Sequence, residues 1–306
     1  VMKDSGGNIL QAEAPLSRGG RTRRMEHTGV WDFASPEAWE KRKMLIRQLL
    51  MRGADTFKTD YGEGAPGEDH HNMYAFQYLK NTWEAIEEIR GPAETMIWAR
   101  PGWSGCQRFP GCWAGDSQST FASMASTLSG CLSAAASGYS WWSHDIGGFH
   151  HYTGRPPDSE LYLRWAEWGM LSPLARFHGT TPREPWHFGE EATRIVSRLM
   201  VLRRELISVM RAAFADLSAQ GKPMGRPLVM DYPEDPAVRD LGTEYMMADR
   251  LLIAPVLEAG ASSRNVYFPE GEWRRWKDDD ERIHGPAMAR VSAGMGRPII
   301  FERIGW

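Results

Sequence analysis

The stretch TFKTDYGEGAP, residues 56–66, joins the end of a predicted strand to a cluster of charges. Phe57 is a strand former, and Lys58, Asp60 and Glu63 follow it closely. Polar side chains at the carboxyl end of a strand are typical of α/β proteins, whose active sites lie at that edge of the sheet. The stretch therefore predicts an active-site strand.

The same succession of strand, polar end and helix recurs along the chain after a segment, residues 1–28, that is predicted to be loop. Apolar periodicity and caps predict helices over 37–53, 73–91, 120–138, 159–171 and about 189–220. Short apolar runs predict strands over 29–33, 54–60, 94–100, 111–116, 139–145 and 173–179. Strands that alternate with helices indicate βαβ units and a parallel sheet.

Two α/β architectures have such a sheet. An open doubly wound sheet gathers its ligand groups at one switch point and usually carries a glycine-rich phosphate loop. Here polar residues end every predicted strand, and no G-x-G-x-x-G or Walker motif opens a helix. We therefore predict a (β/α)8 TIM barrel over residues 1–222 with about six βα units, its first strands missing. Short strands broken by Pro and Gly predict a small antiparallel, sandwich-like β-domain over 223–306.

The bulk composition excludes several classes of partner. A net charge of −3 gives no reason to expect nucleic acid or an anionic membrane as a partner. No apolar run is long enough to span a bilayer, and no signal peptide is recognisable, so a cytoplasmic location is predicted. Three cysteines do not make a disulfide framework. The 14 Trp are either filler of the core and surface or part of a site that stacks rings on sugars. The composition is compatible with a homo-oligomer.

Carboxylates dominate the predicted strand ends. The polar residues there are Asp32, Lys58, Asp60, Glu63, Arg100, Asp116, His144, Asp145 and His178. Two carboxyl groups facing each other are what glycoside hydrolysis requires, one to attack or activate water and one to protonate the leaving oxygen. A metal site is the alternative, but no H-x-H or H-E-x-x-H spacing occurs, so neither a metal nor another cofactor is expected.

Four motifs in order make the interpretation specific: FKTDYGE (57–63), WAGDSQS (113–119), WWSHDIGGF (141–149) and RFHGTTPREPW (176–186). They resemble the barrel motifs of glycoside hydrolase family 31, which includes α-glucosidases, α-xylosidases and sulfoquinovosidases. EYMMADRLLIAPV (244–256) likewise resembles the β-domain of that family. The resemblance implies a retaining α-glycosidase that acts on terminal α-glucosides or α-xylosides through a covalent glycosyl-aspartate.

Carried over by position, the resemblance implies that Asp60 is the nucleophile and Asp116 the general acid/base. Arg100 and Trp113 match residues that line the subsite for the cleaved sugar. A retaining mechanism implies carboxyl groups about 5–5.5 Å apart. Because an ionised nucleophile needs positive charge nearby, Arg100 also has an electrostatic reason for its position.

Three further substrate-binding roles follow from the same resemblance. His178 matches a histidine that hydrogen-bonds a sugar hydroxyl, and Lys58 precedes the nucleophile as it does in xylosidase-like members. Asp145 is expected to orient its neighbours or to contact sugar hydroxyls.

Several alternatives stay open at this point. Lys58 could form a structural ion pair with Glu63, and Asp60 and Asp116 could be helix N-caps. His144 could be a hydrogen-bonded structural histidine. Because family members are normally longer, the chain could be a fragment: a truncated, inactive or carbohydrate-binding remnant. A sulfoquinovosidase or a transglycosidase is the other alternative.

Overall fold

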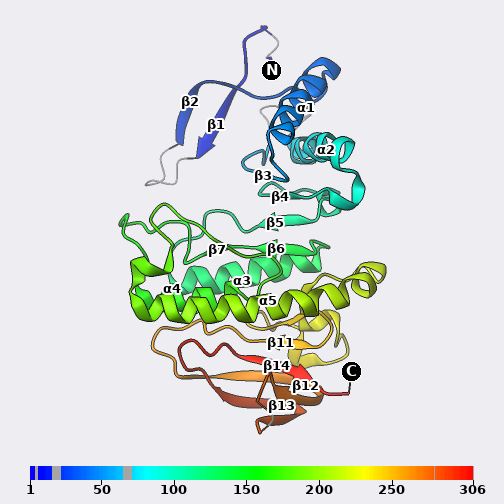
Figure 1. The fold of residues 1–306 in the computed structure, drawn as a ribbon. Helices are drawn as coiled ribbons and strands as arrows, with labels where there is room; N and C mark the ends of the chain where they lie inside the picture. The colour runs from blue at the N-terminus through cyan, green and yellow to red at the C-terminus, as the bar shows by residue number, and fades with distance from the viewer. Residues whose placement is uncertain (4–5, 16–21, 65–70, 279, 306) are drawn as a thin grey trace. The chain divides into compact units, whose positions relative to one another are not determined.

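The computed structural model describes residues 1–3, 6–15, 22–64, 71–278 and 280–305. The chain forms two compact units, Val1–Trp113 and Ala114–Trp306 (Figure 1). The predicted domain boundary near residue 222 stays a prediction.

The first unit contains a parallel sheet and two long helices, one before β3 and one in the connection between β3 and β4. Strands β3, β4 and β5 are neighbours in that order, and Phe57 lies opposite Ile97 while Thr59 lies opposite Ala99. Strands β1 and β2 form a separate antiparallel pair. The elements are β1 (Gln11–Pro15), β2 (Thr22–Gly29), α1 (Pro36–Met51), β3 (Phe57–Thr59), α2 (His71–Arg90), η1 (Pro92–Glu94), β4 (Ile97–Ala99), η2 (Cys106–Arg108) and β5 (Gly111–Trp113).

The beginning of the chain differs from its prediction. The described part of residues 1–28 contains β1 and β2 rather than loop alone, and the strand predicted over 29–33 is wrong. Val30 instead bonds through its backbone to Met2 and Leu10, and Asp32 accepts the backbone N–H of Ala34 in a turn. Hydrogen bonds of the backbone determine the conformation of this segment. Such bonds leave no pattern of apolar residues in the sequence, so the sequence could not predict them.

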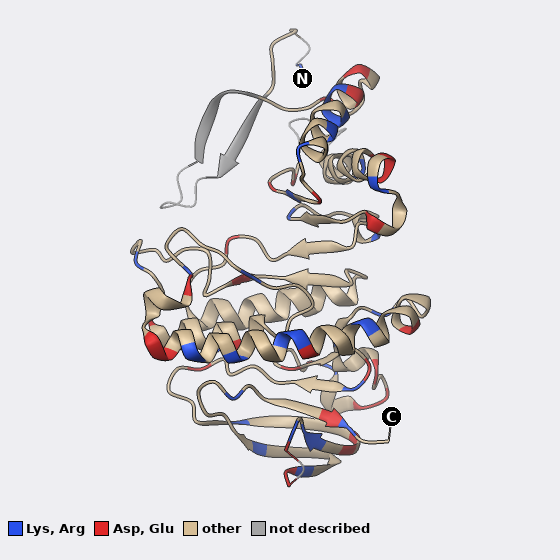
Figure 2. Ribbon diagram, viewed as in Figure 1, with Lys and Arg blue, Asp and Glu red and all other residues tan. Residues whose placement is uncertain are grey.

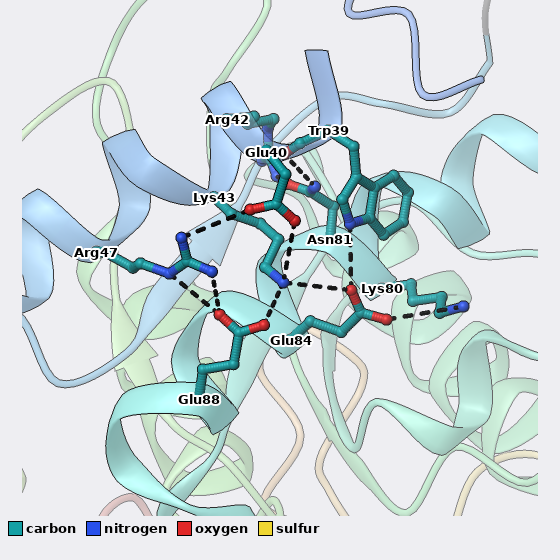
Figure 3. A network of polar contacts seen from close by, with 9 residues as sticks. All are labelled: Trp39, Glu40, Arg42, Lys43, Arg47, Lys80, Asn81, Glu84 and Glu88. Atoms are coloured by element: carbon teal, nitrogen blue, oxygen red, sulfur yellow. Dashed lines mark hydrogen bonds and ion pairs between the residues drawn. The ribbon is translucent and has the colours of Figure 1, made fainter. Parts of the chain in front are cut away.

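Helix α1 begins where the sequence predicts, because the Ser35 side chain accepts the Ala38 N–H and Pro36 follows it. The helix is fixed to α2 by a network of charged side chains around Lys43, which is only 5% exposed (Figure 3). Its ammonium pairs with Glu88 of α2 and lies 3.7 Å from Glu84 of the same helix. A buried ammonium is tolerated only with such partners, so this network holds α2 in one position against α1.

The second unit contains three long helices and the C-terminal sheet. Strands β7 and β8 pair in parallel, with Asp145 opposite Arg176. The strand predicted over 139–145 is interrupted at His144, which separates β6 from β7. The elements before the sheet are α3 (Phe121–Ala136), β6 (Trp141–Ser143), β7 (Asp145–Ile146), α4 (Ser159–Gly169), β8 (Arg176–Phe177), η3 (Pro185–Phe188) and α5 (Glu190–Ala219). Figure 2 shows acidic and basic residues interspersed along α5.

The C-terminal part of this unit is an antiparallel sheet with the order β13-β12-β14-β11-β10-β9. Its core includes Phe268, Trp273 and Phe301, which are fully buried and pack ring against ring. The remaining elements are β9 (Gly225–Pro227), η4 (Leu228–Met230), η5 (Pro236–Val238), β10 (Tyr245–Met247), β11 (Leu251–Ile253), β12 (Ser263–Arg275), β13 (Arg282–Ser292) and β14 (Ile300–Arg303). Among the described residues, no helix is sufficiently long and apolar to span a membrane.

Buried Glu244 makes the stability of this sheet depend on pH. Its carboxylate accepts from the Tyr267 N–H at 2.8 Å and from Arg264 at 3.0 Å, yet burial raises its pKa to about 7. In the folded chain the Glu244 carboxyl thus stays protonated up to a pH of about 7, whereas in the unfolded chain it loses its proton above its ordinary pKa of 4.5. We expect Glu244 to lower the free energy of unfolding by up to about 3 kcal/mol as the pH rises from 4.5 to 7.

Urea unfolding at a series of pH values measures this dependence. Glu244→Gln should flatten the slope between pH 4.5 and 7, because glutamine does not titrate. Glu270→Gln, at an exposed position of β12, is the matched control and should keep the wild-type slope. Equal slopes in the wild type and in Glu244→Gln would contradict the prediction.

Candidate active site

Asp60 lies at the carboxyl end of β3 between two cations. Lys58 Nζ is 3.0 Å from its Oδ2, and Arg100 Nη1 is 2.7 Å from its Oδ1. The backbone N–H of Tyr61 also donates to Oδ1, at 3.0 Å. The two cations come from neighbouring strands, because Lys58 is part of β3 and Arg100 follows β4 directly. The parallel pairing of β3 and β4 therefore brings both charges to one carboxylate.

These contacts keep the Asp60 carboxyl ionised. Burial by itself would raise its pKa, but the hydrogen bond from Lys58 and the charge of Arg100 outweigh burial and hold the pKa below 3.8. A carboxylate that is ionised at neutral pH and only partly buried, 36% exposed, can act as a nucleophile.

Trp113 and Glu63 complete this cluster. The Lys58 ammonium lies 4.2 Å from the centroid of the Trp113 ring, and the Arg100 guanidinium lies 6.0 Å from it. Arg100 also binds Glu63, with Nη2 at 3.2 Å from Oε2. Lys58 thus pairs with Asp60, not with Glu63 as the alternative above supposed. Glu63 instead binds Arg100.

Asp116 is in the second unit, in the loop that follows β5. It is exposed, and no hydrogen bond or ion pair links its carboxylate to another described residue. Thr120, rather than Asp116, caps α3, because its side chain accepts the Ser123 N–H. The N-cap alternative is therefore wrong for Asp116, whose carboxylate is open to solvent.

The loop of Asp116 is held by backbone bonds to the segment after β7. Ser117 O accepts the Phe149 N–H at 2.8 Å, and the Ser119 N–H donates to His150 O at 2.7 Å. Phe149 in turn contacts His178 after β8, with ring centroids 5.5 Å apart. The loop of Asp116 and the segment of His178 thus meet at Phe149.

Asp145 begins β7 and is completely buried. Arg176 of β8 donates to its Oδ1 from Nε at 2.8 Å and from Nη2 at 2.5 Å. In this structure Asp145 therefore fixes a cation of the next strand. The expectation that Asp145 orients its neighbours or contacts sugar hydroxyls stays a prediction.

His144 is a buried, fully bonded histidine. Trp165 Nε1, which can only donate, donates to Nδ1, so the ring carries its proton on Nε2 and directs it at Ser172 Oγ. The ring also stacks on Trp168 with centroids 3.5 Å apart. Burial lowers the pKa of His144 to about 3, so the side chain is neutral and structural.

Arg183 connects the loops around Asp116. From the segment after β8, its Nε and Nη2 donate to Gly148 O at 3.2 and 2.6 Å, and its Nη2 lies 3.4 Å from Ser119 Oγ. Its Nη1 donates to Thr181 O at 2.9 Å. Gly148 must be glycine here, because its φ is +76° and a Cβ would lie 2.7 Å from the Ser119 backbone. One guanidinium thus fastens three loop segments together.

Arg183→Lys should lower the free energy of unfolding by about 2–3 kcal/mol. A lysine keeps the charge but cannot reach all of these acceptors at once, which leaves buried carbonyls unpaired. Thermal or urea unfolding measures the loss. Arg194→Lys, at an exposed position of α5, is the control, and equal stabilities of the two variants would contradict the role of Arg183.

The sequence indicated most of these positions but missed three contacts. Arg176 could have been found, because residues two apart on a strand share a side and His178 was already a candidate. Arg183 and Tyr78, whose hydroxyl donates to Asp60 O at 3.1 Å, follow no local pattern. Within the described ranges, no group of three or more His, Cys, Asp or Glu residues could hold a metal ion.

Comparison with family models gives two consecutive matches. The glycosyl hydrolases family 31 TIM-barrel domain matches residues 2–212, and the glycosyl hydrolase family 31 C-terminal domain matches residues 221–304. The predicted fold class, a TIM-barrel domain followed by a small antiparallel β-domain, is confirmed.

Individual proteins agree with the family models. An α-xylosidase of Emericella nidulans is 34% identical over 275 residues, which are 84% of this chain and 35% of the relative. Alpha-glucosidase 2 of Bacillus thermoamyloliquefaciens is 29% identical over 80% of this chain and 30% of its own length. A solved sulfoquinovosidase of E. rectale superposes with a TM-score of 0.86 at 28% identity, over 99% of this chain and 46% of that one. The chain thus spans about a third of the length of these two curated relatives.

Proposed function

Because this chain belongs to glycosyl hydrolase family 31, we propose that it carries the catalytic groups of a retaining α-glycosidase. The observation that carries the proposal is Asp60, a carboxylate held ionised at a strand end by Lys58 and Arg100. Such a group is suited to attack an anomeric carbon.

In the proposed reaction, Asp60 forms a bond to the anomeric carbon as the glycosidic bond breaks. Asp116 gives its proton to the leaving oxygen, and the product is a glycosyl ester of Asp60. Asp116, now a carboxylate, takes a proton from water, whose oxygen attacks the anomeric carbon and releases Asp60. Two displacements retain the configuration and call for carboxyl groups about 5–5.5 Å apart.

The remaining site residues are proposed to hold the sugar. Arg100 and Trp113 line the subsite of the cleaved sugar, with Lys58 between Asp60 and the Trp113 ring. His178 binds a hydroxyl. Asp145 acts through Arg176, which it binds on the neighbouring strand.

The substrate is proposed to be a terminal α-glucoside or α-xyloside, which the names of the α-xylosidase and α-glucosidase relatives support. Those relatives are about three times as long as this chain. That this chain hydrolyses a glycoside by itself is therefore also a proposal. The second candidate, a carbohydrate-binding remnant, rests on that same difference in length. The cytoplasmic location and the homo-oligomer stay predictions.

Trapping with 5-fluoro-α-glucosyl and 5-fluoro-α-xylosyl fluorides tests the proposal. The fluorine at C5 slows both displacements, whereas the fluoride leaving group keeps the first one fast, so the glycosyl ester accumulates. Mass spectrometry of the digested chain should find one glycosyl group on the peptide that contains Asp60, and none in Asp60→Asn. Glucose or xylose binding by calorimetry without labelling would instead favour the binding remnant.

A further inference from the structure

The backbone just after β3 turns through two left-handed residues. Tyr61 has φ +60° and Gly62 has φ +86°. A tyrosine rarely adopts this conformation, which persists only where surrounding contacts impose it. Through this turn the Tyr61 N–H is directed at Asp60 Oδ1, so the turn and the orientation of the carboxylate are one feature.

Tyr78 of α2 contacts this turn at two points. Its hydroxyl donates to the backbone oxygen of Asp60 at 3.1 Å. Its ring lies against Gly62, where a Cβ would be 2.6 Å from Cδ1 of the ring. Glycine at position 62 is therefore required both by its φ and by the approach of the ring.

Tyr78 is itself fixed from the side of α1. The guanidinium of Arg42 lies 4.5 Å from the centroid of its ring. Arg42 Nη1 also donates to Asn81 Oδ1 at 2.7 Å and to Thr82 Oγ1 at 3.0 Å, and Figure 3 shows Arg42 directed toward Asn81. Arg42 thus contacts the Tyr78 ring and two further residues of α2, and it holds the ring in place while the hydroxyl donates to the Asp60 carbonyl.

We propose that Tyr78 is a positioning residue for Asp60: its hydroxyl and ring hold the left-handed turn, which keeps the carboxylate between Lys58 and Arg100. The inference rests on the proposed function, because positioning matters only if Asp60 is the nucleophile. In the reaction, Tyr78 touches neither substrate nor the reacting atoms. It acts through its hydrogen bond to the backbone oxygen of Asp60.

Tyr78→Phe is the test, since it removes the hydroxyl and leaves the ring against Gly62. Tyr74→Phe is the matched control, one turn earlier on α2. Tyr74 is buried and packs on the same Phe33 ring as Tyr78, but among the described residues no hydrogen bond joins it to Asp60. Both variants thus lose a hydroxyl from the same aromatic cluster, but only Tyr78→Phe loses a hydrogen bond to Asp60.

The first measurement follows Asp60 itself and needs no turnover. In ¹³C-aspartate-labelled chain, NMR titration of the carboxyl carbons reports the pKa of Asp60, assigned by the signal that Asp60→Asn removes. The charges that face this carboxylate are Lys58, Arg100 and Glu63. Tyr78→Phe should raise the pKa of Asp60 toward 3.8, because the carboxylate moves away from its two cations. Tyr74→Phe should leave it at the wild-type value.

The second measurement is the rate of labelling by the fluoro-sugars. Tyr78→Phe should label about tenfold more slowly at saturating reagent, and Tyr74→Phe at the wild-type rate, with equal melting temperatures for the two variants. Identical pKa values and labelling rates in the two variants would overturn the inference. A wild-type chain that is not labelled would refute the proposed function instead, and the titration would still decide whether Tyr78 positions Asp60.

Discussion

Asp60→Asn should reduce the hydrolysis of aryl α-glucosides and α-xylosides by at least about 10⁴-fold, with little change in folding. The amide has nearly the shape of the carboxylate but is not a nucleophile, so no glycosyl ester forms. It also leaves Lys58 and Arg100 without the negative charge that they share. Initial rates with 4-nitrophenyl glycosides of both sugars measure the loss, beside a melting curve.

Asp55→Asn is the matched control for this substitution. Asp55 precedes β3 by two residues, is 83% exposed at its side chain and pairs with Arg90. Its loss removes one negative charge near the same strand and should leave the rate within about twofold. More than a hundredth of the wild-type rate in Asp60→Asn would rule out Asp60 as the nucleophile. A wild-type chain without turnover would favour the binding remnant.

Asp116→Ala should show the signature of a lost general acid/base. We expect a loss of about 10²–10⁴-fold on alkyl α-glycosides, whose leaving groups need protonation. The loss in the first step should be much smaller for 4-nitrophenyl glycosides, which leave without help. Sodium azide should then restore turnover, because azide attacks the glycosyl ester without a general base. The exposure of Asp116 leaves its position accessible to the anion.

The product of azide rescue distinguishes the two aspartates. In Asp116→Ala, azide replaces water in the second displacement and gives an α-glycosyl azide, whereas in Asp60→Ala it replaces the nucleophile and gives the β-azide. NMR of the product assigns the anomer. The same anomer from both variants would refute the division of roles between Asp60 and Asp116.

The sequence predicted regular elements well where the signal is local. Each of the helices α1 to α5 begins and ends within two residues of its prediction, because caps and apolar periodicity are encoded in adjacent residues. The sequence-based prediction failed for residues 29–33. The apolar residues there suggested a strand, but in the structure they are part of a turn that packs on Tyr74. The periodicity of apolar residues indicates which side chains are buried, but it does not indicate the hydrogen-bond partners of the backbone.

By itself, the sequence determined the family, the order of the motifs and the position of Asp60 at a strand end. Only the tertiary structure decided which charges meet: Lys58 binds Asp60 rather than Glu63, and Arg176 binds Asp145. The contact of Tyr78 with Asp60 was equally out of reach, since it joins residues 18 positions apart on different elements. Motifs and caps are local, whereas ion pairs and braces depend on how strands and helices pack, and packing is a property of the whole fold.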